Sequence, residues 1–160
     1  MRRIFLAILC CLSGLAPARA ETRIHAFRLR PGQDVKAEIT RFARERGIRA
    51  GWVVTAVGSL RELRLRLANQ SQPQQWEGPW EVVSLVGTLS HEAVHLHLSA
   101  SDGQGRTLGG HLVEGNLVFT TLEVVVGEST SLQFQRIHDE QTGYPELRVE
   151  TIRQHEVTKP

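Results

Sequence analysis

One short stretch of helical periodicity, followed by a long series of alternating stretches, most constrains the fold of this chain. Val35, Ile39 and Phe42 recur at the spacing of one helix face. Asp34 is suited to cap the start of this helix, and Gly47 is placed to end it. The pattern therefore predicts one amphipathic helix early in the chain.

Outside this helix, apolar and polar residues alternate with the period of two that is typical of strands. Gly58-Ser59 is predicted to be a turn between two of them. The predicted strands cover residues 24–29, 52–57, 63–67, 81–86, 94–98, 117–126, 132–137 and 147–152. Because the later strands follow one another through short turns, the pattern favours an α+β domain with a mixed or mainly antiparallel sheet and one main helix packed on it.

The first 20 residues have the pattern of an export signal. Arg2 and Arg3 precede an apolar stretch, and Ala18-Arg19-Ala20 has the small-x-small form that signal peptidase accepts. A retained membrane anchor is the less favoured alternative, because the apolar run is shorter than the roughly 20 residues that cross a bilayer. We expect residues 1–20 to be removed and the product to be exported, to the periplasm in a bacterium with two membranes, with no membrane-spanning segment.

The remaining chain is predicted to form a single domain over residues 21–152, with a polar tail at 153–160. Cys10 and Cys11, the only cysteines, lie in the signal, so the mature domain has no thiol for a disulfide or a metal. The signal also holds three of the 19 basic residues and none of the 17 acidic ones, which leaves the mature domain nearly neutral. Nucleic-acid binders ordinarily carry net positive charge, so nucleic acid is not the expected partner of the exported form.

A predicted strand with two histidines is the clearest candidate for chemistry. Val94, Leu96 and Leu98 are expected to face the core, while His95 and His97 point to the other side. Side chains two residues apart on a strand lie about 6.5 to 7 Å apart, from which two imidazoles can share a metal ion at about 2.1 Å. Taken alone, such a pair is more often a solvated strand face than a pair of ligands.

Gly109-Gly110-His111 supplies a third imidazole. The two glycines allow backbone conformations that are closed to other residues, which can aim His111 back at the strand. Three histidines and a water molecule make an open zinc site of the catalytic type. The residues alone give equal weight to a simple turn with His111 on the surface. His91 shares the strand parity of His95, but we expect it in a turn and not as a primary ligand.

Several motifs, in their order and spacing, resemble the plants-and-prokaryotes conserved (PPC, or PCC) domain, which is also found in plant AT-hook nuclear-localised proteins. The resemblance covers roughly residues 22–130. Its motifs are Pro31-Gly32, Ala56-Val-Gly58-Ser-Leu60, Trp80-Glu81-Val-Val-Ser-Leu-Val-Gly87-Thr-Leu-Ser90, His95-Leu-His97-Leu-Ser99, Gly109-Gly110-His111-Leu, Gly115 and Thr120-Thr-Leu-Glu123-Val.

This resemblance implies a compact α+β domain that assembles as a homotrimer. It also implies a metal ion, commonly zinc, on the histidines that match His95, His97 and His111. The fold would be similar to that of acetolactate decarboxylase, a zinc enzyme with a three-histidine site. Glu81 and Arg66 match polar positions of the family, and each is a candidate to line the metal cleft as acid, base or anion clamp. The alternative for both is a polar residue on a half-exposed strand.

Three functions follow from these observations. The first is a metal-dependent enzyme or binder that acts on a small molecule. The second is DNA binding, a label that bacterial relatives carry, although this sequence has no Arg-Gly-Arg-Pro core. The third is a trimeric assembly or partner-binding module. We favour an exported, trimeric PPC-domain protein that binds a divalent metal, with zinc as the expected ion and no assigned activity.

Overall fold

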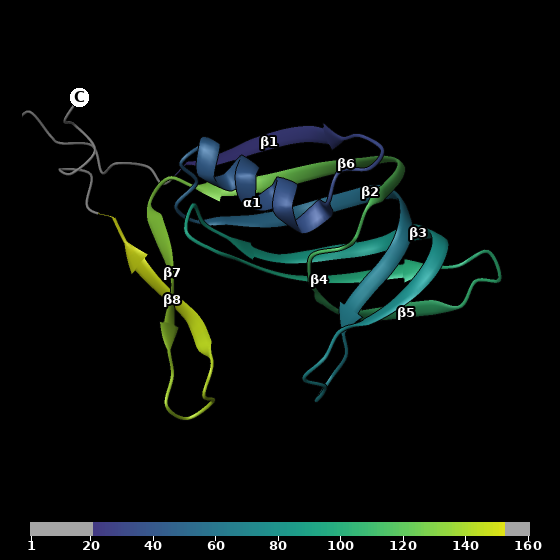
Figure 1. The fold of residues 1–160 in the computed structure, drawn as a ribbon. Helices are drawn as coiled ribbons and strands as arrows, with labels where there is room; N and C mark the ends of the chain where they lie inside the picture. The colour runs from purple at the N-terminus through teal and green to yellow at the C-terminus, as the bar shows by residue number, and fades with distance from the viewer. Residues whose placement is uncertain (1–20, 153–160) are drawn as a thin grey trace, which may run out of the picture.

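The computed structural model describes residues 21–152, so the predicted signal at 1–20 and the predicted tail at 153–160 lie outside the described residues. One helix and eight strands form within this range (Figure 1). They are β1 (Thr22–Leu29), α1 (Val35–Glu45), β2 (Gly51–Arg66), β3 (Gln74–Leu89), β4 (Val94–Ser101), β5 (Thr107–Leu112), β6 (Val118–Ser129), β7 (Leu132–His138) and β8 (Pro145–Thr151). No helix in this part of the chain is long and apolar enough to cross a membrane.

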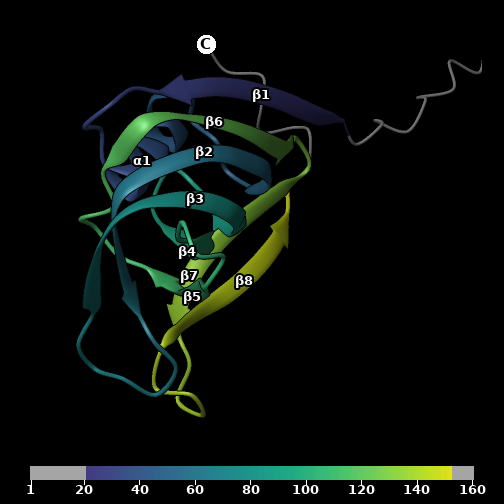
Figure 2. The same ribbon diagram turned by 90° about the vertical axis from the view of Figure 1, so that its right-hand side faces the viewer.

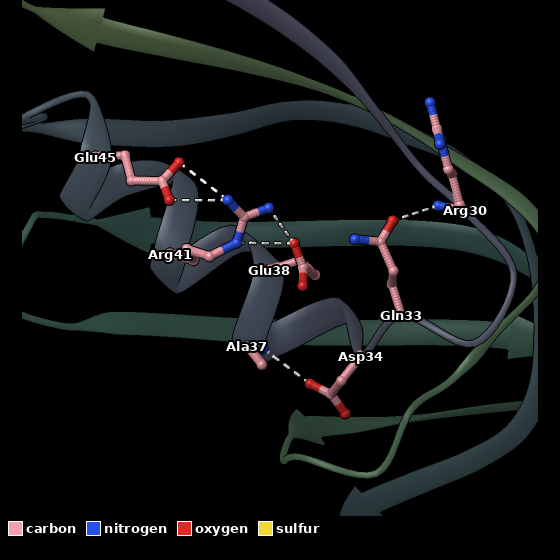
Figure 3. A network of polar contacts seen from close by, with 7 residues as sticks. All are labelled: Arg30, Gln33, Asp34, Ala37, Glu38, Arg41 and Glu45. Carbon is pink, nitrogen blue, oxygen red and sulfur yellow. Dashed lines mark hydrogen bonds and ion pairs between the residues drawn. The ribbon is translucent and has the colours of Figure 1, made fainter.

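Both ends of α1 are capped as predicted. The side chain of Asp34 accepts a hydrogen bond from the backbone N–H of Ala37 at 2.8 Å, which satisfies one free donor of the first turn (Figure 3). Gly47 adopts a left-handed φ of 62° after the last turn, and Ile48 N–H donates to the carbonyl of Ala43 at 3.0 Å. Both predicted ends of the helix are therefore confirmed.

Asp34 also ties the helix to the sheet. Its second carboxylate oxygen accepts hydrogen bonds from the backbone N–H groups of Gly115 and Asn116, at 2.6 and 3.1 Å. The fully buried Asn116 side chain in turn accepts from the backbone N–H of Arg64 and donates to its carbonyl, both at 2.8 Å. One network therefore fixes the start of α1, the loop before β6 and the end of β2.

The strands form one six-stranded sheet in the order β1-β6-β2-β3-β4-β5, and every described pairing is antiparallel. The sheet curves strongly, and β5 returns to pair with the end of β2 through Leu65↔Leu112 and Arg66↔His111 (Figure 2). The helix packs on one face, where Val35, Ile39 and Ala43 are buried. The predicted α+β class is confirmed, with an antiparallel sheet.

Two predictions about local structure are wrong. Gly58-Ser59 is not a turn but part of β2, where the register with β6 shifts. A Cβ on Gly58 would lie 2.1 Å from the carbonyl oxygen of Thr121, so the glycine serves the close approach of two strands. The strand β5, which contains Gly109 and Gly110, was not predicted, because a glycine pair signals a turn more often than a strand.

The outer face of the sheet carries an apolar patch of four valines. Val54 and Val57 on β2 and Val83 and Val86 on β3 are each between 51% and 59% exposed. These two strands pair directly, and the four valines lie between the register partners Trp52↔Thr88 and Ser59↔Glu81. No element of the described chain packs over Val54, Val57 or Val83, whereas Val86 borders a small cavity that the β7–β8 hairpin also lines.

The strands β7 and β8 form a separate hairpin that projects from one end of the sheet (Figure 1). Phe134 N–H donates to the carbonyl of Arg49 at 2.9 Å, which attaches β7 to the segment before β2. The hairpin reaches β4 through Arg136, whose guanidinium lies 3.0 Å from the ring nitrogen Nδ1 of His95. It therefore approaches the outer side of β4 near the start of that strand.

The capping network predicts the effect of Asp34→Ala. The substitution removes three hydrogen bonds to backbone N–H groups and should lower the free energy of unfolding by about 1 to 3 kcal/mol. Urea denaturation at one fixed protein concentration measures this. Glu45→Ala is the control, because Glu45 only pairs with the exposed Arg41 on the same helix (Figure 3), and its effect should be small. Equal effects of the two substitutions would contradict the role of Asp34.

Candidate metal centre

The sheet register brings three histidines together on one face. His97 on β4 is the direct partner of His111 on β5, and His95 lies two residues before His97 on the same strand face. The ring centroids are 5.1 to 5.5 Å apart. The intervening Leu96 and the following Leu98 are 1% and 2% exposed, which confirms that the histidines point away from the core.

Strand pairing, not an unusual backbone, delivers His111 to this group. Neither Gly109 nor Gly110 has a left-handed φ, so the predicted role of these glycines in redirecting the chain is wrong. A Cβ on Gly110 would lie 2.9 Å from the carbonyl oxygen of Arg66. The glycine therefore lets β5 approach β2, and this approach sets His111 directly opposite Arg66.

Gly87 on β3 fixes the position of His95 in a similar way. It has a φ of 145°, and a Cβ at this position would lie 2.0 Å from the carbonyl oxygen of His95. Only glycine permits this approach of the two backbones. The placement of His95 therefore depends on a glycine of the neighbouring strand.

Two of the three histidines, His95 and His111, are held in the neutral form that binds metal ions. Burial of the His111 ring, and then the positive charge of Arg66, lower the pKa of His111 to about 4. Burial, and then the charge of Arg136, also lower the pKa of His95. Both rings are therefore neutral near pH 7, with a nitrogen lone pair for a ligand.

The geometry fits a single metal ion. The ligand nitrogens of the three histidines all lie within 4.8 Å of one another. A tetrahedral zinc ion about 2.1 Å from each nitrogen requires these atoms to be roughly 3.4 Å apart, a change that small side-chain rotations can supply. Nδ1 of His111 is buried and has no hydrogen-bond partner in the described part of the chain, as expected for an atom whose partner is not protein.

A cavity of about 930 Å³ opens between the histidines and the β7–β8 hairpin. Arg136 on β7 donates a hydrogen bond to Nδ1 of His95 at 3.0 Å. The wall of the cavity includes His95, His111, Arg66, Arg136, Tyr144 and Glu146. The hairpin residues in this wall were not predicted, because no local pattern in residues 132–151 points to the histidine strands.

The remaining candidates from the sequence occupy different places. Arg66 lies at the site, opposite His111. Glu81 pairs with Ser59 and Ser101 further along the sheet. It lines neither the cavity described above nor a second, smaller cavity of about 330 Å³ that borders His95 and His97. His91 lies in the turn before β4, where its backbone N–H donates to Ile48, and it is not in the three-histidine group.

Comparison with known proteins agrees with this arrangement. The family model of the Plants and Prokaryotes Conserved (PCC) domain matches residues 17–130, which include all three histidines. The chain belongs to the PPC family. This PPC domain extends its site beyond the match, since Arg136, Tyr144 and Glu146 come from the hairpin that follows residue 130.

Three similar proteins differ in how much of their own length the matching region occupies. A hypothetical protein from Salmonella cholerae-suis is 40% identical, with a TM-score of 0.81 over 84% of this chain and 97% of its own. A metal-containing protein from Archaeoglobus fulgidus is 28% identical, with a TM-score of 0.71 over 81% of this chain and 96% of its own. The bifunctional protein GlmU of Synechococcus sp. (strain JA-3-3Ab) is 46% identical over 130 residues, which are 81% of this chain and 21% of GlmU. The chain thus spans about a fifth of the length of that relative.

The close approach at Gly87 predicts that Gly87→Ala disturbs the site. The added methyl group overlaps the backbone of His95, so the free energy of unfolding should fall by about 2 kcal/mol or more. The NMR signals of the His95 ring should also shift. Gly109→Ala is the matched control on β5, because its Cβ would meet no atom closer than 3.5 Å. Unchanged stability in Gly87→Ala would contradict this account of how His95 is positioned.

Proposed function

We propose that this PPC domain binds one divalent metal ion, with zinc as the expected ion, through His95, His97 and His111. The observation that carries the proposal is the grouping of three imidazole ligand atoms within 4.8 Å of one another on one sheet face. The metal-containing relative from Archaeoglobus fulgidus, which shares the fold at 28% identity, supports it. Neutral imidazoles suit zinc and other late first-row ions, so nickel, copper and iron are competitors in the same site.

Three protein ligands leave one coordination position for water or a small molecule. A zinc ion bound in this way lowers the pKa of its water or polarises a carbonyl oxygen. The residues of the chain supply the surroundings: Arg66 and Arg136 add positive charge at the cavity wall, and Glu146 adds a carboxylate. This combination supports a metal-dependent binder or enzyme for a small molecule.

We also propose that the mature protein is an exported homotrimer. Export rests on the pattern of residues 1–20. The trimer is supported by the apolar patch of Val54, Val57, Val83 and Val86, because a contiguous apolar sheet face of this kind is typical of a surface that packs against another chain.

Metal content tests the site directly. The purified mature protein, supplied with zinc and dialysed, should hold about one metal ion per chain by mass spectrometry. Substitution of His95, His97 and His111 to alanine together should abolish this content, while His91→Ala should retain it. A wild-type protein that stays metal-free after zinc is supplied would overturn the proposal and favour the assembly-module alternative.

Sedimentation velocity tests the trimer. Val57→Asp places a charge within the apolar patch and should convert trimers to smaller species. Ile24→Asp, at another exposed apolar residue on the edge strand β1, should leave the assembly unchanged. A monomeric wild type, or a trimer that survives Val57→Asp, would contradict the proposed interface.

A further inference from the structure

The contact between Arg136 and His95 competes with metal binding. A neutral imidazole has one nitrogen lone pair and one N–H group, and a guanidinium can only donate. The hydrogen bond from Arg136 therefore uses the lone pair on Nδ1 of His95 and leaves the proton on Nε2. In this state His95 has no lone pair left for a metal ion.

Metal binding to His95 must therefore displace Arg136, whichever nitrogen becomes the ligand. A metal ion on Nδ1 would take the place of the guanidinium. A metal ion on Nε2 would move the ring proton to Nδ1, where two donors would then face each other at 3.0 Å. In both cases the guanidinium of Arg136 is released next to the cavity.

Once Arg136 is released, two arginines without a carboxylate partner border the cavity. Arg66 lines the same cavity, and neither Arg66 nor Arg136 forms an ion pair with any acid among residues 21–152. The carboxylate of Glu146 on the same wall accepts a hydrogen bond from Thr142 at 3.0 Å instead. By contrast, Arg41 on the helix is held between two glutamates.

The cavity has the character of a site for an organic anion. Two half-buried guanidiniums offer forked donors that match the two oxygens of a carboxylate. Ala93, Val94, Tyr144 and Pro145 add apolar surface to the same wall. A carboxylate that carries a short apolar body suits both kinds of surface.

We propose that the cavity bordered by His95, His111 and the β7–β8 hairpin binds a small carboxylate through Arg66 and Arg136, and that metal binding makes Arg136 available by removing it from His95. This inference rests on the metal site proposed above. It makes metal and carboxylate binding mutually favourable, because metal binding releases every donor of Arg136 for the carboxylate, and the negative charge of the carboxylate in turn favours the metal ion.

Carboxylate binding is tested on protein loaded with cobalt(II), because the visible absorption of cobalt changes when the surroundings of the ion change. Titration of the cobalt-loaded protein with butyrate should give a saturable spectral change, and the neutral isostere butyramide should give none. Arg66→Ala and Arg136→Ala should each weaken butyrate binding by about tenfold. A wild type without a saturable response, or variants that bind butyrate as well as wild type does, would overturn the proposal.

The competition part is tested by measuring cobalt affinity against a chelating dye. Arg136→Ala should raise cobalt affinity by about tenfold, because it frees the His95 lone pair as well as removing a positive charge. Arg66→Ala removes a charge only and should raise it less. Cobalt affinity in Arg136→Ala that equals or falls below the wild-type value would overturn the coupling.

Arg148→Ala is the matched control, since Arg148 lies on the same hairpin, pairs with Glu150 and lines neither cavity. It should leave both affinities unchanged. Arg66 belongs to the six-stranded sheet, so its variant tests the carboxylate site even if Arg136→Ala loosens the hairpin. Failure to bind cobalt in the wild type would refute the proposed metal site, whereas cobalt binding without a butyrate response would refute only the carboxylate inference.

Discussion

The pairing of β5 with the end of β2 is the contact on which the histidine site depends. Leu65 and Leu112 are fully buried on the core side of this pairing, so apolar burial holds the two strands together. On the outer side the same register sets Arg66 against His111. His111 is also opposite His97 on β4. The three paired strands therefore place Arg66, His111 and His97 side by side across the sheet. The core thus determines the geometry of the surface site.

The sequence predicts the parts of this structure that local physics determines. The cap residues Asp34 and Gly47 set the helix ends, because they act on backbone groups only a few residues away. The alternation around His95 and His97 gave the correct face of β4. It could not show β5, because Gly109 and Gly110 have the pattern of a turn, and the pairing with the end of β2 that completes this strand joins segments far apart in the chain. The same limit applies to Gly58, whose role is set by β6.

The hairpin shows why the candidate site was only partly predictable. Both strands of the hairpin were predicted, from the apolar and polar alternation in residues 132–137 and 147–152. Nothing in that alternation indicates that Arg136 reaches His95, a contact that joins positions 41 residues apart. Such a contact depends on how the hairpin leaves the sheet after β6, which is a property of the folded domain. The three histidines could be grouped from the sequence, whereas the residues that surround them could not.

The electrostatics of the site give the two arginines opposing effects on a metal ion. Burial is the main cause of the lowered pKa values of His111 and His95, and the charges of Arg66 and Arg136 lower them further. Both effects keep these two imidazoles neutral and therefore able to act as ligands. The same charges repel a divalent cation at the shared site. Glu146 supplies one negative charge to the cavity wall, which does not balance two guanidiniums and a dication. An anion in the cavity relieves that imbalance, so charge alone favours a site that binds metal and anion together over one that binds metal alone.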